Sequence, residues 1–197
     1  MRLYLVRHGD ATSAEENPRR PLSAKGRGEV ERMASFLARS GVKPQRVVHS
    51  GKLRAGETAA ILARALAPGL MLEEAESLGP NDPVDALIAA ARGWAAAGSG
   101  DVMVAGHMPF MARALAQLVG AETSLEFAAF GSGAVACLEP GPGGRLPARS
   151  RSGFAPAFAK PASAGEGRSA KAGWRLLWLV APELLGGLMQ LEPLADR

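Results

Sequence analysis

The residues with the clearest chemical potential are two arginines and two histidines: Arg7, His8, Arg54 and His107. A guanidinium binds two oxygens of a phosphate dianion through a planar pair of N–H groups, which a lysine cannot do. An imidazole with an unprotonated nitrogen can attack phosphorus, and neighbouring guanidinium charges disfavour its protonation. A second imidazole, when protonated, can donate to a phosphoryl oxygen. The set therefore indicates transfer of a phosphoryl group whose oxygens are stabilised by fixed cations.

The neighbours of these residues also suit a bound anion. Gly9 and Gly106 stand next to the two histidines and allow the backbone to approach a ligand closely. Leu53 begins a predicted helix whose first N–H groups can add to anion binding. An Arg-His or Gly-His pair alone is usually a surface feature, so the prediction depends on the combination.

The predicted elements bring these residues to one edge of a sheet. Short apolar runs predict strands at 2–6, 46–49 and 101–105, and polar residues follow each of them directly. Strands that alternate with helices indicate an α/β sheet covered on both faces, and ligands bind outside the carboxyl ends of such strands. Further strands are predicted at 71–72, 133–138 and 174–180, and helices at 23–39 with Ser23 as N-cap, 53–66, 83–97 with Pro83 in the first turn, and 109–119.

Four segments, in this order, carry a resemblance to a known family. They are Leu5-Val6-Arg7-His8-Gly9-Asp10-Ala11, Pro21-Leu22-Ser23-Ala24-Lys25-Gly26, Ser50-Gly51-Lys52-Leu53-Arg54-Ala55-Gly56-Glu57-Thr58-Ala59 and Val104-Ala105-Gly106-His107-Met108-Pro109. Together they resemble the histidine phosphatase superfamily (phosphoglycerate mutase-like, branch 1), and within it the short bacterial phosphohistidine phosphatases. The resemblance spans about residues 1–139 and also covers the last predicted strand.

The resemblance implies a fold and a role for each matched residue. The fold is a three-layer α/β/α sandwich with a mostly parallel central sheet. His8 is the nucleophile that becomes phosphohistidine, and Arg7, Arg54 and His107 complete the phosphate pocket. The family uses neither a metal nor an organic cofactor, so none is expected here.

Three positions depart from the family pattern or leave it open. Gly51 stands where a proline is usual, and Met108 where many members have asparagine. Larger members place a glutamate general acid after the second helix, and Glu76 is the best-placed candidate for that role. A solvated carboxylate is an equally good interpretation of Glu76. The first loop offers Glu15 and Glu16 as weaker candidates.

The doubt about a general acid bears on the substrate. An alkoxide leaving group benefits from a positioned acid, whereas the imidazole of a phosphohistidine leaves more readily. Only 34 residues separate Leu66 from Asp101, which leaves little chain for a lid over a small sugar phosphate. We therefore expect phosphohistidine in proteins as the substrate. A small phosphate ester, handled by a phosphomonoesterase or mutase of the same fold, is the alternative, and a non-catalytic phosphate-binding regulatory module is an alternative of another class.

The basic charge of the chain is concentrated in one segment. The net charge is +4, but residues 141–175 contain seven basic residues and a single acid, so the rest is slightly acidic. Residues 141–173 are rich in Gly, Pro, Ala and Ser, which indicates a low-complexity insertion between the last two strands of a single domain, 1–197. The segment has few aromatics, so nucleic-acid binding is not expected.

Remaining features set limits on location and on metal chemistry. No run of 18 apolar residues is present, and the apolar run at the N-terminus is too short for a signal peptide, so a cytoplasmic protein without membrane contact is expected. Cys137 is the only cysteine, in an apolar context that predicts burial. The third histidine, His49, is expected to be structural or exposed, because the histidine spacing fits no local zinc pattern.

Overall fold

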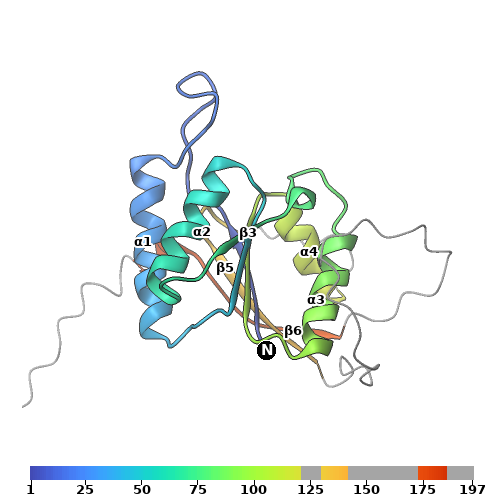
Figure 1. Cartoon of the computed structure of the whole chain (residues 1–197). Coiled ribbons are helices and arrows are strands. Elements are labelled where there is room, and N and C mark those ends of the chain that lie inside the picture. Colours follow the sequence, from blue (N-terminus) through green and yellow to red (C-terminus); the bar gives the residue numbers. More distant parts are fainter. Residues whose placement is uncertain (121–129, 142–172, 186–197) are drawn as a thin grey trace, which may run out of the picture.

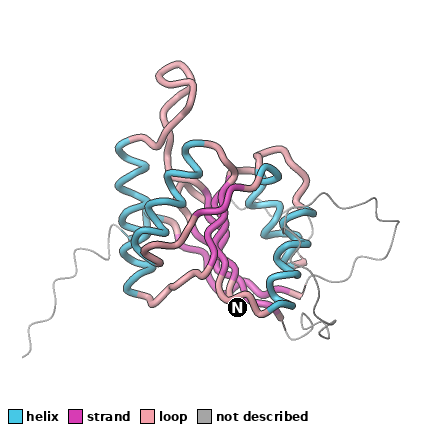
Figure 2. Tube along the Cα trace, viewed as in Figure 1, coloured by secondary structure: helices cyan, strands magenta, loops and turns pink. Residues whose placement is uncertain are grey.

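The computed structural model describes residues 1–120, 130–141 and 173–185 and shows one sheet between two helical layers (Figures 1 and 2). The elements in chain order are β1 (Leu3–Arg7), α1 (Ala24–Arg39), β2 (Arg46–His49), α2 (Leu53–Leu66), β3 (Leu72–Glu74), the 3-10 helix η1 (Glu76–Leu78), α3 (Asp85–Ala97), β4 (Val102–Gly106), α4 (Phe110–Val119), β5 (Val135–Pro140), β6 (Trp174–Val180) and α5 (Pro182–Leu185).

The sheet has six strands in the order β3-β2-β4-β1-β5-β6. The first four run parallel, with Arg7 of β1 opposite Gly106 of β4 and His49 of β2 opposite Ala105. Strands β5 and β6 run antiparallel to their neighbours. The three-layer α/β/α sandwich with a mostly parallel sheet is therefore confirmed, and the carboxyl ends of β1, β2 and β4 lie at one edge.

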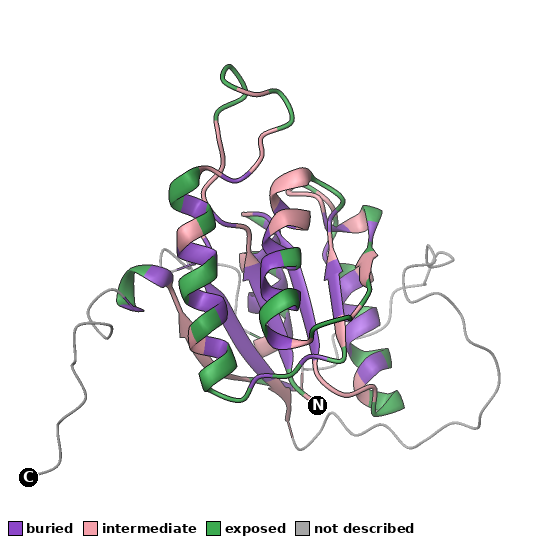
Figure 3. Cartoon of the chain, turned by 60° about the vertical axis from the view of Figure 1, so that its left-hand side comes forward, coloured by how far each residue is buried: buried purple, intermediate pink, exposed green. Residues whose placement is uncertain are grey.

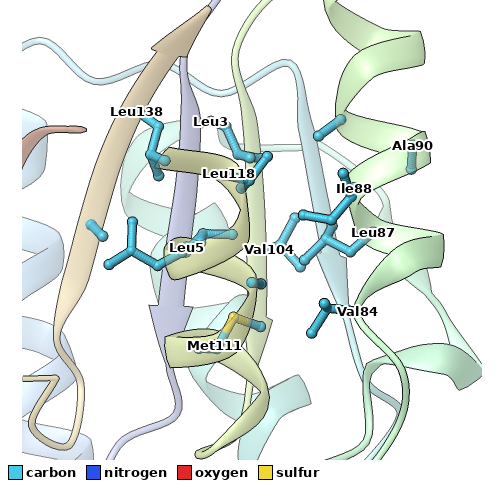
Figure 4. Packing of buried hydrophobic residues seen from close by; sticks show 14 of the residues in the cluster. Leu3, Leu5, Val84, Leu87, Ile88, Ala90, Val104, Met111, Leu118 and Leu138 are labelled. Carbon is cyan, nitrogen blue, oxygen red and sulfur yellow. The ribbon is translucent and has the colours of Figure 1, made fainter. Parts of the chain in front are cut away.

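Alternate residues of each central strand face opposite helical layers, as the two-residue repeat of a strand requires. Leu3 and Leu5 of β1 pack in the core beneath α3 and α4, which Figure 4 shows from close by. Tyr4 and Val6 of the same strand pack in the second core, beneath α1 and α2. The central strands β1 and β4 are buried on both faces, whereas the helices bury one stripe each (Figure 3). Cys137 is fully buried, as predicted.

Helix α1 begins where the sequence predicts it. The Ser23 hydroxyl accepts a hydrogen bond from the Gly26 N–H at 3.0 Å and donates one to the Asp10 carboxylate at 2.6 Å. A Cβ atom on Gly26 would lie 2.1 Å from the carbonyl oxygen of Asp10, so only glycine lets the helix approach the loop after β1 so closely. The spacing of Ser23 and Gly26 thus has a direct packing reason.

Some boundaries differ from prediction. Helix α3 begins at Asp85 with Val84 as its N-cap, so Pro83 precedes the helix instead of occupying its first turn. The short helices η1 and α5 have too few residues to show a helical repeat, and the sequence did not indicate them. Most of the predicted insertion, 142–172, lies outside the described residues. Among the helices that are described, none is long and apolar enough to cross a membrane.

Candidate active site

His8 follows β1 and has a defined tautomer. Its Nδ1 lies 2.6 Å from the carbonyl oxygen of Gly9, and because a carbonyl only accepts, Nδ1 carries the proton. Its Nε2 accepts a hydrogen bond from Nε of Arg54 at 3.1 Å, which again requires a lone pair there. Two independent contacts therefore place the ring lone pair of His8 on Nε2.

Arg54 and the loop after β1 are held together by Thr58 of helix α2. The fully buried Thr58 hydroxyl accepts from the Gly9 N–H at 3.1 Å and donates to the carbonyl oxygen of Arg54 at 2.7 Å. The preceding residue, Glu57, accepts from the Leu22 N–H at 2.6 Å. The helix that carries Arg54 thus fixes the position of the loop after β1 through its own side chains.

Arg7 is anchored on the other side of His8. Its Nη1 donates to the carbonyl oxygen of Phe130 at 2.9 Å, and its Nε is buried with no partner among the described residues. The backbone here joins the two halves of the sheet: His8 N–H donates to Gly106 O at 3.0 Å, and Gly133 N–H donates to His8 O at 3.1 Å. The backbone of His8 is therefore held from both neighbouring strands.

His107 is almost completely buried and lies against His8, with ring centroids 4.9 Å apart. Its Nε2 lies 2.6 Å from the hydroxyl of Ser50, which is also buried. Its Nδ1 is buried without a partner among the described residues. When the Ser50 hydroxyl donates to Nε2, the ring proton lies on Nδ1, which then has no acceptor among the described residues.

Both imidazoles are neutral in the protein at pH 7. Burial is the main cause that lowers the pKa of His8 to about 4, with smaller effects from Arg54 and Arg7. Burial also lowers the pKa of His107 to about 3, followed by the effect of His8. The arginines were predicted to keep the nucleophile unprotonated, but desolvation does more. With this lowered pKa, a neutral N–H of His107 is the donor available at pH 7, and donation does not depend on a protonated ring.

Gly51 occupies the position where the family has proline. Its φ is +73°, a left-handed value that proline cannot adopt. A Cβ there would also lie 2.3 Å from Oε1 of Glu74. The backbone of the turn between β2 and α2 therefore requires a residue other than proline at position 51.

A pocket of about 530 Å³ lies beside this turn. Its lining residues come from the β2–α2 turn and from the segment after β3: Ser50, Gly51, Lys52, Glu74, Glu76, Gly79, Pro80, Asn81 and Asp82. Glu76 is exposed and shares this pocket with Ser50, which contacts His107. Glu15 and Glu16 are exposed in the loop between β1 and α1. The structure thus places Glu76 in the same pocket as the partner of His107, and its described hydrogen bonds include none to either ring.

His49 has a structural contact, as expected: its Nδ1 accepts the Gly51 N–H at 3.1 Å. Within the described part of the chain, no three His, Cys, Asp or Glu side chains gather where they could hold a metal ion. Sequence reasoning missed Ser50 and Thr58 as individual residues. Both lie inside the matched Ser50–Ala59 segment, so their place in that segment was the available signal.

Comparisons with known proteins agree with this geometry. The model of the histidine phosphatase superfamily (branch 1) matches residues 3–79. The phosphohistidine phosphatase SixA of Escherichia coli K12 is 30% identical over 144 residues, which cover 73% of this chain and 89% of that protein. A solved structure of the protein histidine phosphatase SixA with tungstate has a TM-score of 0.72 at 24% identity, covering 94% of this chain and 99% of that chain. The SixA homologue from Agrobacterium tumefaciens, described as a phosphohistidine phosphatase, has a TM-score of 0.64 at 23% identity, covering 92% and 97%.

The sandwich fold, with paired histidines and arginines at the carboxyl edge of its sheet, defines a phosphatase. The chain belongs to the histidine phosphatase superfamily, branch 1, and is similar to its SixA members.

Proposed function

We propose that the chain removes phosphoryl groups from phosphohistidine in proteins, through a covalent phosphohistidine on His8. The observation that carries this mechanism is the tautomer of His8. Its Nδ1–H donates to Gly9, so Nε2 keeps the lone pair that attack on phosphorus requires. Its low pKa keeps that lone pair available throughout the neutral range.

The reaction has two displacements at phosphorus. In the first, Nε2 of His8 forms a bond to phosphorus while the bond to the leaving nitrogen of the substrate breaks, and the leaving imidazole takes up a proton. In the second, water attacks the phosphorus of phospho-His8, the electron pair of the P–N bond returns to Nε2, and phosphate and a proton are released. Neither step needs a metal or an organic cofactor.

The residues around His8 stabilise the phosphoryl oxygens in both steps. Arg54 turns its donors from Nε2 to these oxygens when substrate binds, and Arg7 adds a second guanidinium. His107 donates through Nδ1, because Ser50 occupies its Nε2. Positive charge therefore surrounds the transferring group while the nucleophile stays neutral.

A protein side chain suits this site better than a small ester. The 35 residues between α2 and β4 (67–101) form only β3, η1 and α3, with no added subdomain over the site. The similarity to SixA, named a phosphohistidine phosphatase, supports the same substrate class. We also propose a cytoplasmic location, as expected from the sequence.

The test compares turnover of a phosphohistidine peptide, a phosphoserine peptide, phosphoglycerate and p-nitrophenyl phosphate by the protein and its His8→Ala variant. His49→Ala is the matched control, since His49 lies outside the histidine pair. We expect the phosphohistidine peptide to be the best substrate, and His8→Ala alone to lose turnover. Intact-protein mass spectrometry after an alkaline quench should detect one phosphoryl group, on His8. Full turnover by His8→Ala overturns the mechanism, and a preference for phosphoglycerate overturns the substrate.

A further inference from the structure

Arg20 has an unusual backbone conformation for its residue type. Its φ is +49°, and it is the only non-glycine residue with a positive φ in the described ranges. The left-handed region costs a residue with a Cβ about 1 kcal/mol or more, and such strain is often found at functional sites. The Arg20 N–H donates to Asn17 O at 2.8 Å, and Nε donates to Thr12 O at 3.1 Å, so the loop holds both backbone and side chain in place.

The loop that carries Arg20 is fixed against the active site at its base. Residues 11–22 project from the carboxyl edge of the sheet (Figures 1 and 2), and Ala11 and Leu22 form a bridge at the base. The Leu22 N–H, two residues after Arg20, donates to Glu57 of the helix that carries Arg54. The position of Arg20 is thus tied to the elements that hold the phosphate-site residues.

The guanidinium of Arg20 is not neutralised by a partner. In the described part of the chain no carboxylate forms an ion pair with it, and only its Nε makes a side-chain hydrogen bond. The pKa of exposed Glu15 is lowered mainly by hydrogen bonds from its own backbone and from Ser13. The charge of Arg20 has a smaller effect on it. Its two terminal nitrogens are therefore free to bind an anion.

The charge of Arg20 acts on three groups of the site at once. Burial is the main cause of the lowered pKa values of His8, His107 and Arg54, and the positive charge of Arg20 lowers each of them further. Arg54, Arg7 and Lys52 are the other cations that act on the two histidines. The three affected groups surround the place of the phosphoryl group. Arg20 lies at the base of the 11–22 loop at the same edge of the sheet, two residues before the Leu22 contact to the helix of Arg54, so the position of the loop and the effect of the charge agree.

We propose that Arg20 is a third guanidinium of the phosphate site, which binds an oxygen of the substrate phosphoryl group from the side of the 11–22 loop. This inference rests on the proposed function, since it assumes that the pocket beside His8 binds phosphate. The strained backbone then has a purpose: it keeps the guanidinium at the site and not in solvent. The positive φ alone favours glycine or asparagine, and the charge of arginine explains why this residue stands there.

The test separates anion binding from backbone strain. Arg20→Gly removes the guanidinium and also relieves the positive φ, so the melting temperature should stay the same or rise. The dissociation constant for inorganic phosphate, measured by calorimetry, should rise about tenfold or more, as for loss of a charge-assisted hydrogen bond. The dissociation constant of Arg20→Lys should lie between those of the native protein and Arg20→Gly, because an ammonium keeps the charge but lacks the planar pair of N–H donors. Arg19→Gly is the control, since Arg19 is exposed in the same loop.

Each outcome decides the proposal. Weaker phosphate binding in Arg20→Gly with near-normal binding in Arg19→Gly supports it. Unchanged phosphate binding in Arg20→Gly, or equal weakening in both variants, overturns it, because the effect would then be absent or due to general charge. The Arg20 test measures phosphate binding and does not require turnover. If His8→Ala keeps full turnover, the covalent mechanism is overturned, but the binding result for Arg20 still holds.

Discussion

Acidification should destabilise this protein through its buried histidines, and His8→Asn should remove a measurable part of that effect. The pKa of His8 is about 4 in the folded chain, against 6.5 for an ordinary histidine. As pH falls below 6.5, the unfolded chain takes up a proton that the folded chain excludes. The contribution of His8 to the free energy of unfolding is therefore fully present above pH 6.5 and is lost as the pH falls from 6.5 to about 4.

The magnitude follows from the two pKa values. A difference of about 2.5 pKa units corresponds to about 3 kcal/mol in full, of which about 2.5 kcal/mol is lost between pH 7.5 and 4.5. Asparagine does not titrate, so His8→Asn should lose about that much less stability over the same range. Because the charge of His8 also contributes to the low pKa of His107, the difference includes a smaller part from that residue.

The assay is urea unfolding at pH 7.5 and 4.5, with the free energy of unfolding extrapolated to water for each protein. His49→Asn is the control, because His49 is less buried and makes a structural contact outside the pair. It should change the acid-induced loss less than His8→Asn does. An identical loss in the native protein and in His8→Asn would refute the conclusion that His8 is held neutral by burial.

Three further changes test the site and the packing beneath it. Ser50→Ala should lower kcat/KM about tenfold with little change in melting temperature, because His107 then loses the partner that sets its tautomer; unchanged kcat/KM would contradict that role. Gly26→Ala should cost about 2–3 kcal/mol in urea unfolding and reduce turnover, because its Cβ would overlap the Asp10 backbone; a variant as stable as the native protein would show that the contact is loose. Glu76→Gln should slow turnover of a phosphoserine peptide about 100-fold and hardly affect a phosphohistidine peptide if Glu76 is a general acid; no change with either peptide would mean that it is a solvated carboxylate.

The parts of the fold that could be predicted from sequence are those with a local signal. Apolar runs bounded by Gly, Pro or polar residues placed the strands, and Ser23 placed the start of α1, within a residue or two. The common edge could be predicted because parallel strands end together. Helices η1 and α5 are shorter than two helical turns and carry no periodicity.

Site details depended on contacts between distant residues. Ser50 reaches His107 across 57 positions, and Thr58 reaches Gly9 across 49, so neither contact has a local pattern. The protonation of His107 depends on its burial in the folded chain, which residue type does not reveal. The strained φ of Arg20 is likewise set by the loop and not by the arginine itself.

Because β5 runs antiparallel to β1, the chain enters β5 at one edge of the sheet and leaves it at the other. Gly133 precedes the strand at the edge of His8, and Pro140 ends it at the opposite edge, paired with Trp174 of β6. Both attachment points of segment 142–172 therefore lie at the edge away from the histidine pair. Chain can be added or removed between Pro140 and Trp174 without altering the register that aligns the catalytic groups.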